Sequence, residues 1–193
     1  MDRLNTADYF REAMVILEDE GREALTVAQL CDRLAVTKGS FYHHFGGMPT
    51  FVSQFLGYWE SEHSARLLTV SRAQRAPATR ITVLFDAAIE LPHGSEAAIR
   101  GWSRNNAEVA AVTARVDRKR ERHLVDAISA VGVDRSRARV LGRLALDLLV
   151  GAQQREHPVD LRRLRQMFDE VKRLISIGGD PRLVPALAAT PGA

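Results

Sequence analysis

A short segment near the N-terminus, residues 37–45, gathers side chains that can donate hydrogen bonds. It reads Thr-Lys-Gly-Ser-Phe-Tyr-His-His-Phe. Hydroxyls, imidazoles and a lysine ammonium donate to phosphate oxygens and to acceptors on base edges. Phe41 and Phe45 stand one helical turn apart and predict a short helix over 38–45 with one buried side. The segment therefore predicts a nucleic-acid contact on its other side.

Each of these residues has a physical role in such a contact. Thr37 can cap the helix, whose N-terminus then presents free N–H groups and a partial positive charge to a phosphate. Gly39 lacks a Cβ and lets the backbone approach base edges closely. Lys38 can donate to guanine acceptors or to a phosphate. The predicted DNA-binding residues are Thr26, Thr37, Lys38, Gly39, Ser40, Tyr42, His43 and His44.

The preceding residues predict the helices that position this segment. A helix over 26–34 begins with the capping-box pattern Thr26 to Gln29, and Leu30 and Leu34 continue its apolar stripe. Cys31 lies in that stripe, so we expect a buried thiol without redox function. Only a short turn separates the two helices, which is the spacing of a helix-turn-helix.

The stretch Leu25-Thr26-Val27-Ala28-Gln29-Leu30-Cys31-Asp32-Arg33-Leu34-Ala35-Val36, followed by residues 37–45, resembles the TetR family of transcriptional regulators. The resemblance covers about residues 6–56, and the remainder is similar in length and helix order only. It implies an all-α fold. An N-terminal three-helix helix-turn-helix domain is expected over 1–47, and a helical ligand-binding and dimerisation domain over 48–177. Residues 178–193 are rich in Gly, Pro and Ala, and we expect a flexible tail there.

One position departs from the family pattern. Relatives often carry a lysine at the start of the fourth helix, where it binds a phosphate, but this chain has Met48 followed by Pro49. Residues 1–47 also contain five basic and eight acidic side chains, a net charge of −3. Bulk charge therefore does not attract DNA here, and we expect a lower non-specific affinity with a weaker salt dependence.

The C-terminal helices predict a dimer. Apolar residues recur along 135–154 and 158–176 over a broader surface than one hairpin covers, and the family pairs its last two helices with their two-fold mates. One recognition helix also reads too few base pairs alone. The alternative is that these residues pack only in their own core. The predicted interface residues are Leu141, Leu144, Leu148, Leu161, Leu164, Phe168, Val171 and Ile175.

The resemblance also implies an inducer pocket formed by helices four to seven. Aromatic walls with a few polar groups suit an apolar or amphipathic small molecule. The alternative for each candidate is an ordinary core position. The candidates are Phe55, Trp59, His63, Phe85, Trp102, Asn105 and Asn106.

Several other classes of function find no support in the sequence. Adjacent helical residues point about 100° apart, so His43 and His44 do not share a metal site. The sequence has no phosphate-binding glycine loop and no GxSxG motif, so we expect neither an enzyme nor a cofactor. No apolar run approaches the roughly 20 residues of a membrane span. With no secretory pattern and a single cysteine, a cytoplasmic protein is expected.

These observations predict a dimeric repressor that binds a palindromic double-stranded DNA operator and is released by a small molecule. Two alternatives remain at this point. The C-terminal part could serve only for dimerisation, in a regulator without a ligand. An all-helical carrier or enzyme would require an acid–base or metal constellation, which the sequence lacks. Activation in place of repression is also open.

Overall fold

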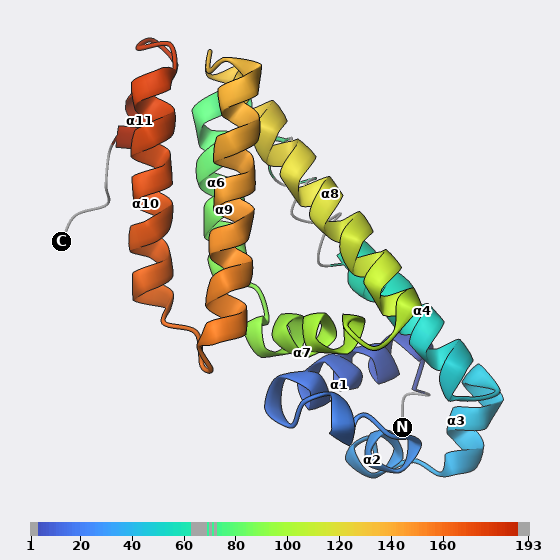
Figure 1. The fold of residues 1–193 in the computed structure, drawn as a ribbon. Coiled ribbons are helices and arrows are strands. Elements are labelled where there is room, and N and C mark those ends of the chain that lie inside the picture. The colour runs from blue at the N-terminus through green and yellow to red at the C-terminus, as the bar shows by residue number, and fades with distance from the viewer. Residues whose placement is uncertain (1–3, 63–68, 70, 72, 189–193) are drawn as a thin grey trace. The chain divides into compact units, whose positions relative to one another are not determined.

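The computed structural model describes residues 4–62, 69, 71 and 73–188, and every regular element in these residues is helical (Figure 1). The all-α prediction is therefore confirmed. The α-helices are α1 (Thr6–Asp19), α2 (Val27–Arg33), α3 (Lys38–Phe45), α4 (Met48–Glu60), α6 (Pro77–Ile89), α7 (His93–Ser103), α8 (Ala107–Ala130), α9 (Arg135–Arg155), α10 (Leu161–Gly178) and α11 (Pro185–Ala188). A 3₁₀ turn, η1 (Arg22–Ala24), precedes α2.

The chain forms two compact units, and their boundaries differ from the expected single boundary after residue 47. The first contains Met1–Glu62 and Pro92–Ala114, and the second contains His63–Leu91 and Arg115–Ala193. Helices α4 and α7 thus belong with the three predicted DNA-binding helices. The residues of α8 are divided between the two units.

The core of the first unit is aromatic. Tyr9 and Phe10 on α1 contact Phe41 and Phe45 on α3, with ring centroids 5.2 to 6.1 Å apart. Within α3, the rings of Phe41 and Phe45 are 5.1 Å apart. Phe51 on α4 completes the cluster at 5.0 Å from Phe45. Aromatic pairs at these separations contribute beyond the area they bury. The Phe41 and Phe45 pattern seen in the sequence therefore fixes α3 against both α1 and α4.

A polar contact joins α1 to α7 within the same unit. Pro92 at the N-terminus of α7 offers no side-chain cap, and the Glu18 carboxylate accepts hydrogen bonds from the Gly94 and Ser95 backbone N–H groups at 3.0 and 2.7 Å. The Ser95 hydroxyl lies 2.9 Å from the same carboxylate and 2.8 Å from the Met14 carbonyl. A negative group at a helix N-terminus also interacts favourably with the helix dipole. Glu18 therefore caps α7 from another helix.

The second unit packs α6, α9, α10, α11 and the C-terminal part of α8 around one apolar core. Helices α9 and α10 lie side by side (Figure 1), and Phe85 of α6 stacks on Phe168 of α10 at 4.8 Å. The core of this unit is formed by aliphatic residues around this one stacked pair.

The C-terminal segment contradicts the expected flexible tail over most of its length. Residue 178 is still in α10, and α11 follows. Val184 and Leu187 are buried in the core of the second unit, and the Asp180 N–H donates to the Val131 carbonyl at 2.8 Å. The prediction of a flexible tail was based on the Gly, Pro and Ala content of this segment. Two buried apolar side chains, Val184 and Leu187, are enough to pack it against the core. Residues 189–193 lie outside the described residues.

None of the described helices combines the length and the apolar character that crossing a membrane would require.

The contact between α1 and α7 predicts opposite effects for two glycines of α7. A Cβ on Gly94 would lie 2.9 Å from the Glu18 carbonyl oxygen, whereas a Cβ on Gly101 would meet nothing within 4 Å. We expect Gly94→Ala to lower the free energy of unfolding by about 1–3 kcal/mol through overpacking. Gly101→Ala is the matched control and should raise it by about 0.5–1 kcal/mol. Urea unfolding measures both, and equal effects would show that the close approach at Gly94 is relaxed in solution.

Candidate nucleic-acid interface

The two helices of the helix-turn-helix are capped as their sequences predict. The Thr26 side chain accepts from the Gln29 N–H at 3.1 Å, and the Thr37 side chain accepts from the Ser40 N–H at 3.3 Å. In a complete capping box the Gln29 side chain would accept from the Thr26 backbone N–H. Here the Gln29 side chain instead donates to the carboxylate of Glu20. Gly46 ends α3 in the left-handed conformation.

The two sides of α3 have different environments. Phe41 and Phe45 are buried, while Lys38, Gly39 and His43 are exposed. Tyr42 is 52% exposed, which is high for an aromatic ring. The exposed side of α3 therefore carries an ammonium, an imidazole and a phenol, the donors that the sequence predicted.

Two of the predicted contact residues are partly engaged by α1. The Ser40 hydroxyl lies 3.0 Å from the Tyr9 hydroxyl, and the His44 ring centroid lies 5.5 Å from that of Tyr9. Both side chains are half-buried, whereas Thr26 and Thr37 are exposed like the central donors of α3. Ser40 and His44 thus help to fix α3 on α1 and keep only part of their surface for a ligand.

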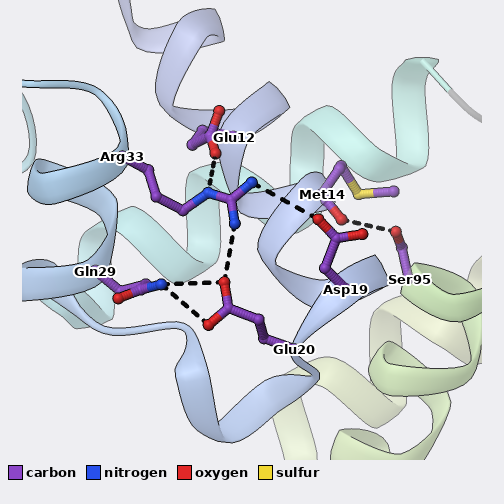
Figure 2. Close-up of polar contacts among 7 residues, drawn as sticks. All are labelled: Glu12, Met14, Asp19, Glu20, Gln29, Arg33 and Ser95. Carbon is purple, nitrogen blue, oxygen red and sulfur yellow. Dashed lines mark hydrogen bonds and ion pairs between the residues drawn. The ribbon is translucent and has the colours of Figure 1, made fainter.

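Arg33 fixes α2 to α1, a role that the sequence analysis missed. Its guanidinium contacts three carboxylates around it (Figure 2): Glu12, Glu20 at 2.9 Å and Asp19 at 3.7 Å. The Gln29 side chain donates to the same Glu20 at 3.0 Å. The hydrogen bond to Glu12 raises the pKa of the Arg33 guanidinium, so the group is charged throughout the physiological range.

These contacts explain how an acidic segment can present a DNA-binding surface. Of its eight acidic residues, Glu12, Asp19 and Glu20 meet Arg33, and Glu18 caps α7. Asp8 accepts from the Asn5 N–H and pairs with Arg11. Five negative side chains are thus engaged inside the unit. The net charge of −3 therefore says little about the field at α3.

Cys31 and Met48 take the positions expected for them. Cys31 is buried with its sulfur 3.6 Å from the Thr37 carbonyl oxygen, and burial raises the pKa of the thiol, which makes it less reactive. Met48 begins α4 and is half-buried, with Pro49 beside it in the first turn. The first turn of α4 therefore offers no basic side chain for a phosphate.

The predicted pocket residues do not form one pocket in the described structure. Phe55 and Trp59 are fully buried in the first unit, and the Trp59 indole N–H donates to Glu96 at 3.1 Å. The Arg22 guanidinium covers the Trp102 ring at 4.1 Å, and Trp102 and Asn105 line a surface groove.

The remaining pocket candidates have separate positions. The Asn106 side chain accepts from the Val109 N–H at 3.0 Å near the start of α8. Phe85 belongs to the second unit, and His63 lies outside the described residues. Phe55 and Trp59 are therefore core positions, which is the alternative that the sequence had left open for them.

A cavity does occur in the second unit. Its volume is about 50 Å³, and α6, α8, α9 and α10 all contribute to its walls. Its lining includes Phe85, Leu124, Leu149 and Phe168 together with Arg120. Six of the seven predicted pocket residues are described by the structure, and of these six only Phe85 lines this cavity.

The predicted dimer-interface residues divide into two groups. Five of them (Leu141, Leu164, Phe168, Val171 and Ile175) are buried in the core of their own chain, which leaves them little surface for a partner. Leu144 and Leu161 are exposed, and Leu148 is half-buried. The structure adds Val140 and Ile177, which are 66% and 77% exposed, and Leu174. The sequence showed apolar stripes on both helices but not which stripe faces inward.

Comparisons with known proteins agree with this geometry. Residues 10–52 match the family described as bacterial regulatory proteins, tetR family. A transcriptional regulator from Rhodococcus sp. Rha1 is 18% identical with a TM-score of 0.76, covering 92% of this chain and 98% of its own. A TetR regulator from Haloarcula marismortui is 15% identical with a TM-score of 0.74, covering 91% and 98%.

A regulator from Saccharomonospora viridis, solved in complex with choline, has the same fold. It is 12% identical with a TM-score of 0.73, covering 87% of this chain and 95% of its own. None of the curated proteins matches the chain in sequence.

The fold and the exposed donors of α3 define a helix-turn-helix DNA-binding protein. The family match over residues 10–52 makes this segment similar to the N-terminal part of the tetR family, and the solved regulators share the fold of the whole chain.

The contact between Trp59 and Glu96 predicts a cost for a conservative substitution. Glu96 is fully buried, and its second oxygen lies 3.9 Å from the Arg100 guanidinium. Trp59→Phe keeps an aromatic ring but removes one donor to a buried carboxylate. We expect the free energy of unfolding, measured in urea, to fall by about 1–3 kcal/mol.

Trp102→Phe is the control, since it also removes an indole and weakens only the contact with Arg22. It should cost less than about 1 kcal/mol. Equal losses for the two variants would contradict a specific role of the buried hydrogen bond.

Proposed function

We propose that this protein is a transcriptional repressor that binds a palindromic operator as a homodimer and leaves the DNA when a small molecule binds. The observation that carries the proposal is the exposed side of α3, where Lys38, Tyr42 and His43 point away from a buried aromatic core. A helix of this kind reads base edges in the major groove. Thr26 and Thr37 stand at the two helix N-termini, where backbone N–H groups favour a phosphate.

The exposed apolar side chains on α9 and α10 support a homodimer. Val140 and Leu144 stand one turn apart on α9, and Leu174 and Ile177 share a side of α10. The Arg137 guanidinium of α9 donates to the Leu174 carbonyl, so the two pairs belong to neighbouring parts of the helix pair. Large apolar side chains at such exposure mark an interaction surface. A second copy would cover them and would supply the second recognition helix that a palindrome requires.

The cavity in the second unit supports regulation by a ligand. Its walls include Arg120 and Leu124 of α8, and the same helix begins at Ala107 in the first unit. A ligand that prefers one arrangement of these walls can shift α8 along its length, and the shift is limited by its differential affinity for the two states. The Saccharomonospora viridis regulator with choline is a protein of this fold that holds a small molecule.

The other functions have weaker support. A regulator without a ligand would need no cavity, and activation in place of repression would use the same DNA contacts. A carrier or enzyme would need a reactive constellation, and among the residues that the structure describes no three His, Cys, Asp or Glu side chains gather to hold a metal ion.

The DNA-binding part predicts the result of an electrophoretic shift assay with the DNA that flanks the gene. We expect the wild-type protein to shift this DNA and a Lys38→Ala/Tyr42→Ala double variant to bind much more weakly. Removing one hydrogen-bonding side chain from a base edge costs about 1–3 kcal/mol of binding free energy. If Lys38 binds a phosphate, the slope of log affinity against log salt should also decrease by about 1 per subunit.

Arg118→Ala removes one exposed positive charge from the second unit and serves as the control for that assay. It should shift the DNA like the wild-type protein. If the double variant binds as tightly as Arg118→Ala, α3 is not the recognition helix.

The dimer predicts that one charge in the exposed stripe separates the subunits. We expect Leu144→Glu to convert the dimer to a monomer in analytical ultracentrifugation, because a carboxylate buried without a partner is strongly unfavourable. Its operator affinity should fall as well, since one head contacts only half of a palindrome. Val15→Glu, at an exposed position of α1, should leave the dimer intact. A monomeric wild-type protein would contradict the proposal.

A further inference from the structure

A groove between α6 and α10 of the second unit combines buried apolar side chains with two exposed charged ones. Its volume is about 310 Å³, and the buried side chains of Phe85, Ile89 and Phe168 line it. Asp86 of α6 and Arg165 of α10 line it as well, and both are exposed. Within the part of the chain that the structure describes, neither of these two side chains has a hydrogen bond or an ion pair. One carboxylate and one guanidinium are therefore available to a ligand in this groove.

The remaining charged side chains of the groove neutralise each other. Asp169 and Lys172 form an ion pair at 2.7 Å. They stand one and two turns after Arg165, so the three residues share a side of α10. Leu174 and Ile177, which the proposed dimer would cover, do not line the groove. The groove and the proposed dimer surface thus use different side chains of α10.

We propose that this groove binds an aliphatic zwitterion, in which a hydrocarbon chain separates an ammonium from a carboxylate. The Arg165 guanidinium receives the carboxylate, because its planar fork of donors matches two oxygens. The Asp86 carboxylate accepts from the ammonium at the other end. The hydrocarbon chain covers Phe85 and Phe168, whose rings stack at 4.8 Å. This site goes beyond the proposed function, since binding here does not depend on repression.

The two available charges of the groove select the class of ligand. Asp86 repels a simple carboxylate or phosphate, and Arg165 repels a simple amine. A neutral apolar molecule gains only the contact with the aromatic rings. An ω-amino carboxylate provides a counterpart for both charged groups and also covers the apolar side chains.

The positions of Asp86 and Arg165 favour a ligand whose two charges are far apart. The two residues belong to different helices, and no ion pair joins them in the described structure. The axes of packed helices lie about 8–10 Å apart. In an α-amino acid the ammonium and the carboxylate are bonded to the same carbon. Such a ligand therefore reaches both side chains less well than an ω-amino acid does.

The volume of the groove fits a six-carbon chain that includes its two charged ends. A cavity of about 150 Å³ in another protein holds the six carbons of benzene, so nine non-hydrogen atoms need about 225 Å³ at the same density. The groove of about 310 Å³ holds that many, whereas the cavity of about 50 Å³ in the same unit does not. The appropriate probe is therefore ε-aminocaproate, which has nine non-hydrogen atoms.

The test is isothermal titration of the full-length protein with ε-aminocaproate up to about 50 mM, because ligands of this size bind modestly. Caproate and hexylamine each lack one of the two charges, and we expect both to bind about three- to tenfold more weakly. Norleucine is an isomer of the probe with its two charges on adjacent groups, and we expect the same loss. No detectable binding of ε-aminocaproate would overturn the proposal, as would equal binding of norleucine.

Two pairs of variants locate the site. Asp86→Asn and Arg165→Met each remove one charge from the groove, and we expect the affinity for ε-aminocaproate to fall about three- to tenfold. Glu90→Gln and Arg162→Met are the matched controls at exposed positions near them that do not line the groove. The controls should bind the probe like the wild-type protein. Equal affinity in a groove variant and its control would refute the assignment.

The singly charged probes separate direct contact from a change in the shape of the groove. Caproate has no ammonium, so its affinity should fall in Arg165→Met but not in Asp86→Asn. Hexylamine has no carboxylate, so its affinity should fall in Asp86→Asn but not in Arg165→Met. If either variant weakens all three ligands equally, the side chain acts through the groove's shape and the assigned contact is contradicted.

Discussion

The carboxylate of Glu18 joins parts of the chain that are 76 residues apart, and the first unit depends on this contact. It accepts two backbone N–H groups and one hydroxyl at the start of α7, a helix that has no cap of its own. Gly94 permits the close approach because any Cβ would collide with the backbone of α1. Helix α7 also carries Glu96, which receives the indole hydrogen bond from Trp59 of α4. One helix thus holds both α1 and α4.

Other acidic residues of this unit also make contacts that join one helix to another. A DNA-binding head with more acidic than basic side chains is unfavourable if all its charges face the ligand. Arg33 meets three of the carboxylates and Glu18 is occupied by α7, so much of the negative charge attaches α2 and α7 to α1 (Figure 2). The exposed donors of α3 lie opposite an aromatic core that packs α3 against α1 and α4.

In the second unit, some apolar side chains of a helix are buried and others on the same helix are exposed. On α10 the residues at one helical spacing (Leu164, Phe168, Val171 and Ile175) are buried, whereas Leu174 and Ile177 on the other side remain exposed. The buried stripe forms the core with α6 and α9, and the exposed residues are the ones that would meet a second copy in the proposed dimer. Between the stripes and α8 the core leaves a cavity in which Arg120 is the charged member.

Local patterns in the amino-acid sequence were enough to predict the two helices of the helix-turn-helix, the caps at Thr26 and Thr37 and the exposed side of α3. Side chains three and four residues apart share a side of a helix, and Thr26 and Thr37 cap the helices that follow them. The resemblance to the TetR family over residues 10–52 rests on the same local pattern. Three features instead depended on how the helices pack: which apolar stripe of α9 and α10 is buried, which aromatic residues line a cavity, and what surrounds Arg33, Glu18 and Arg120. Burial and charge pairing depend on neighbours that are distant in sequence, and periodicity carries no information about those neighbours.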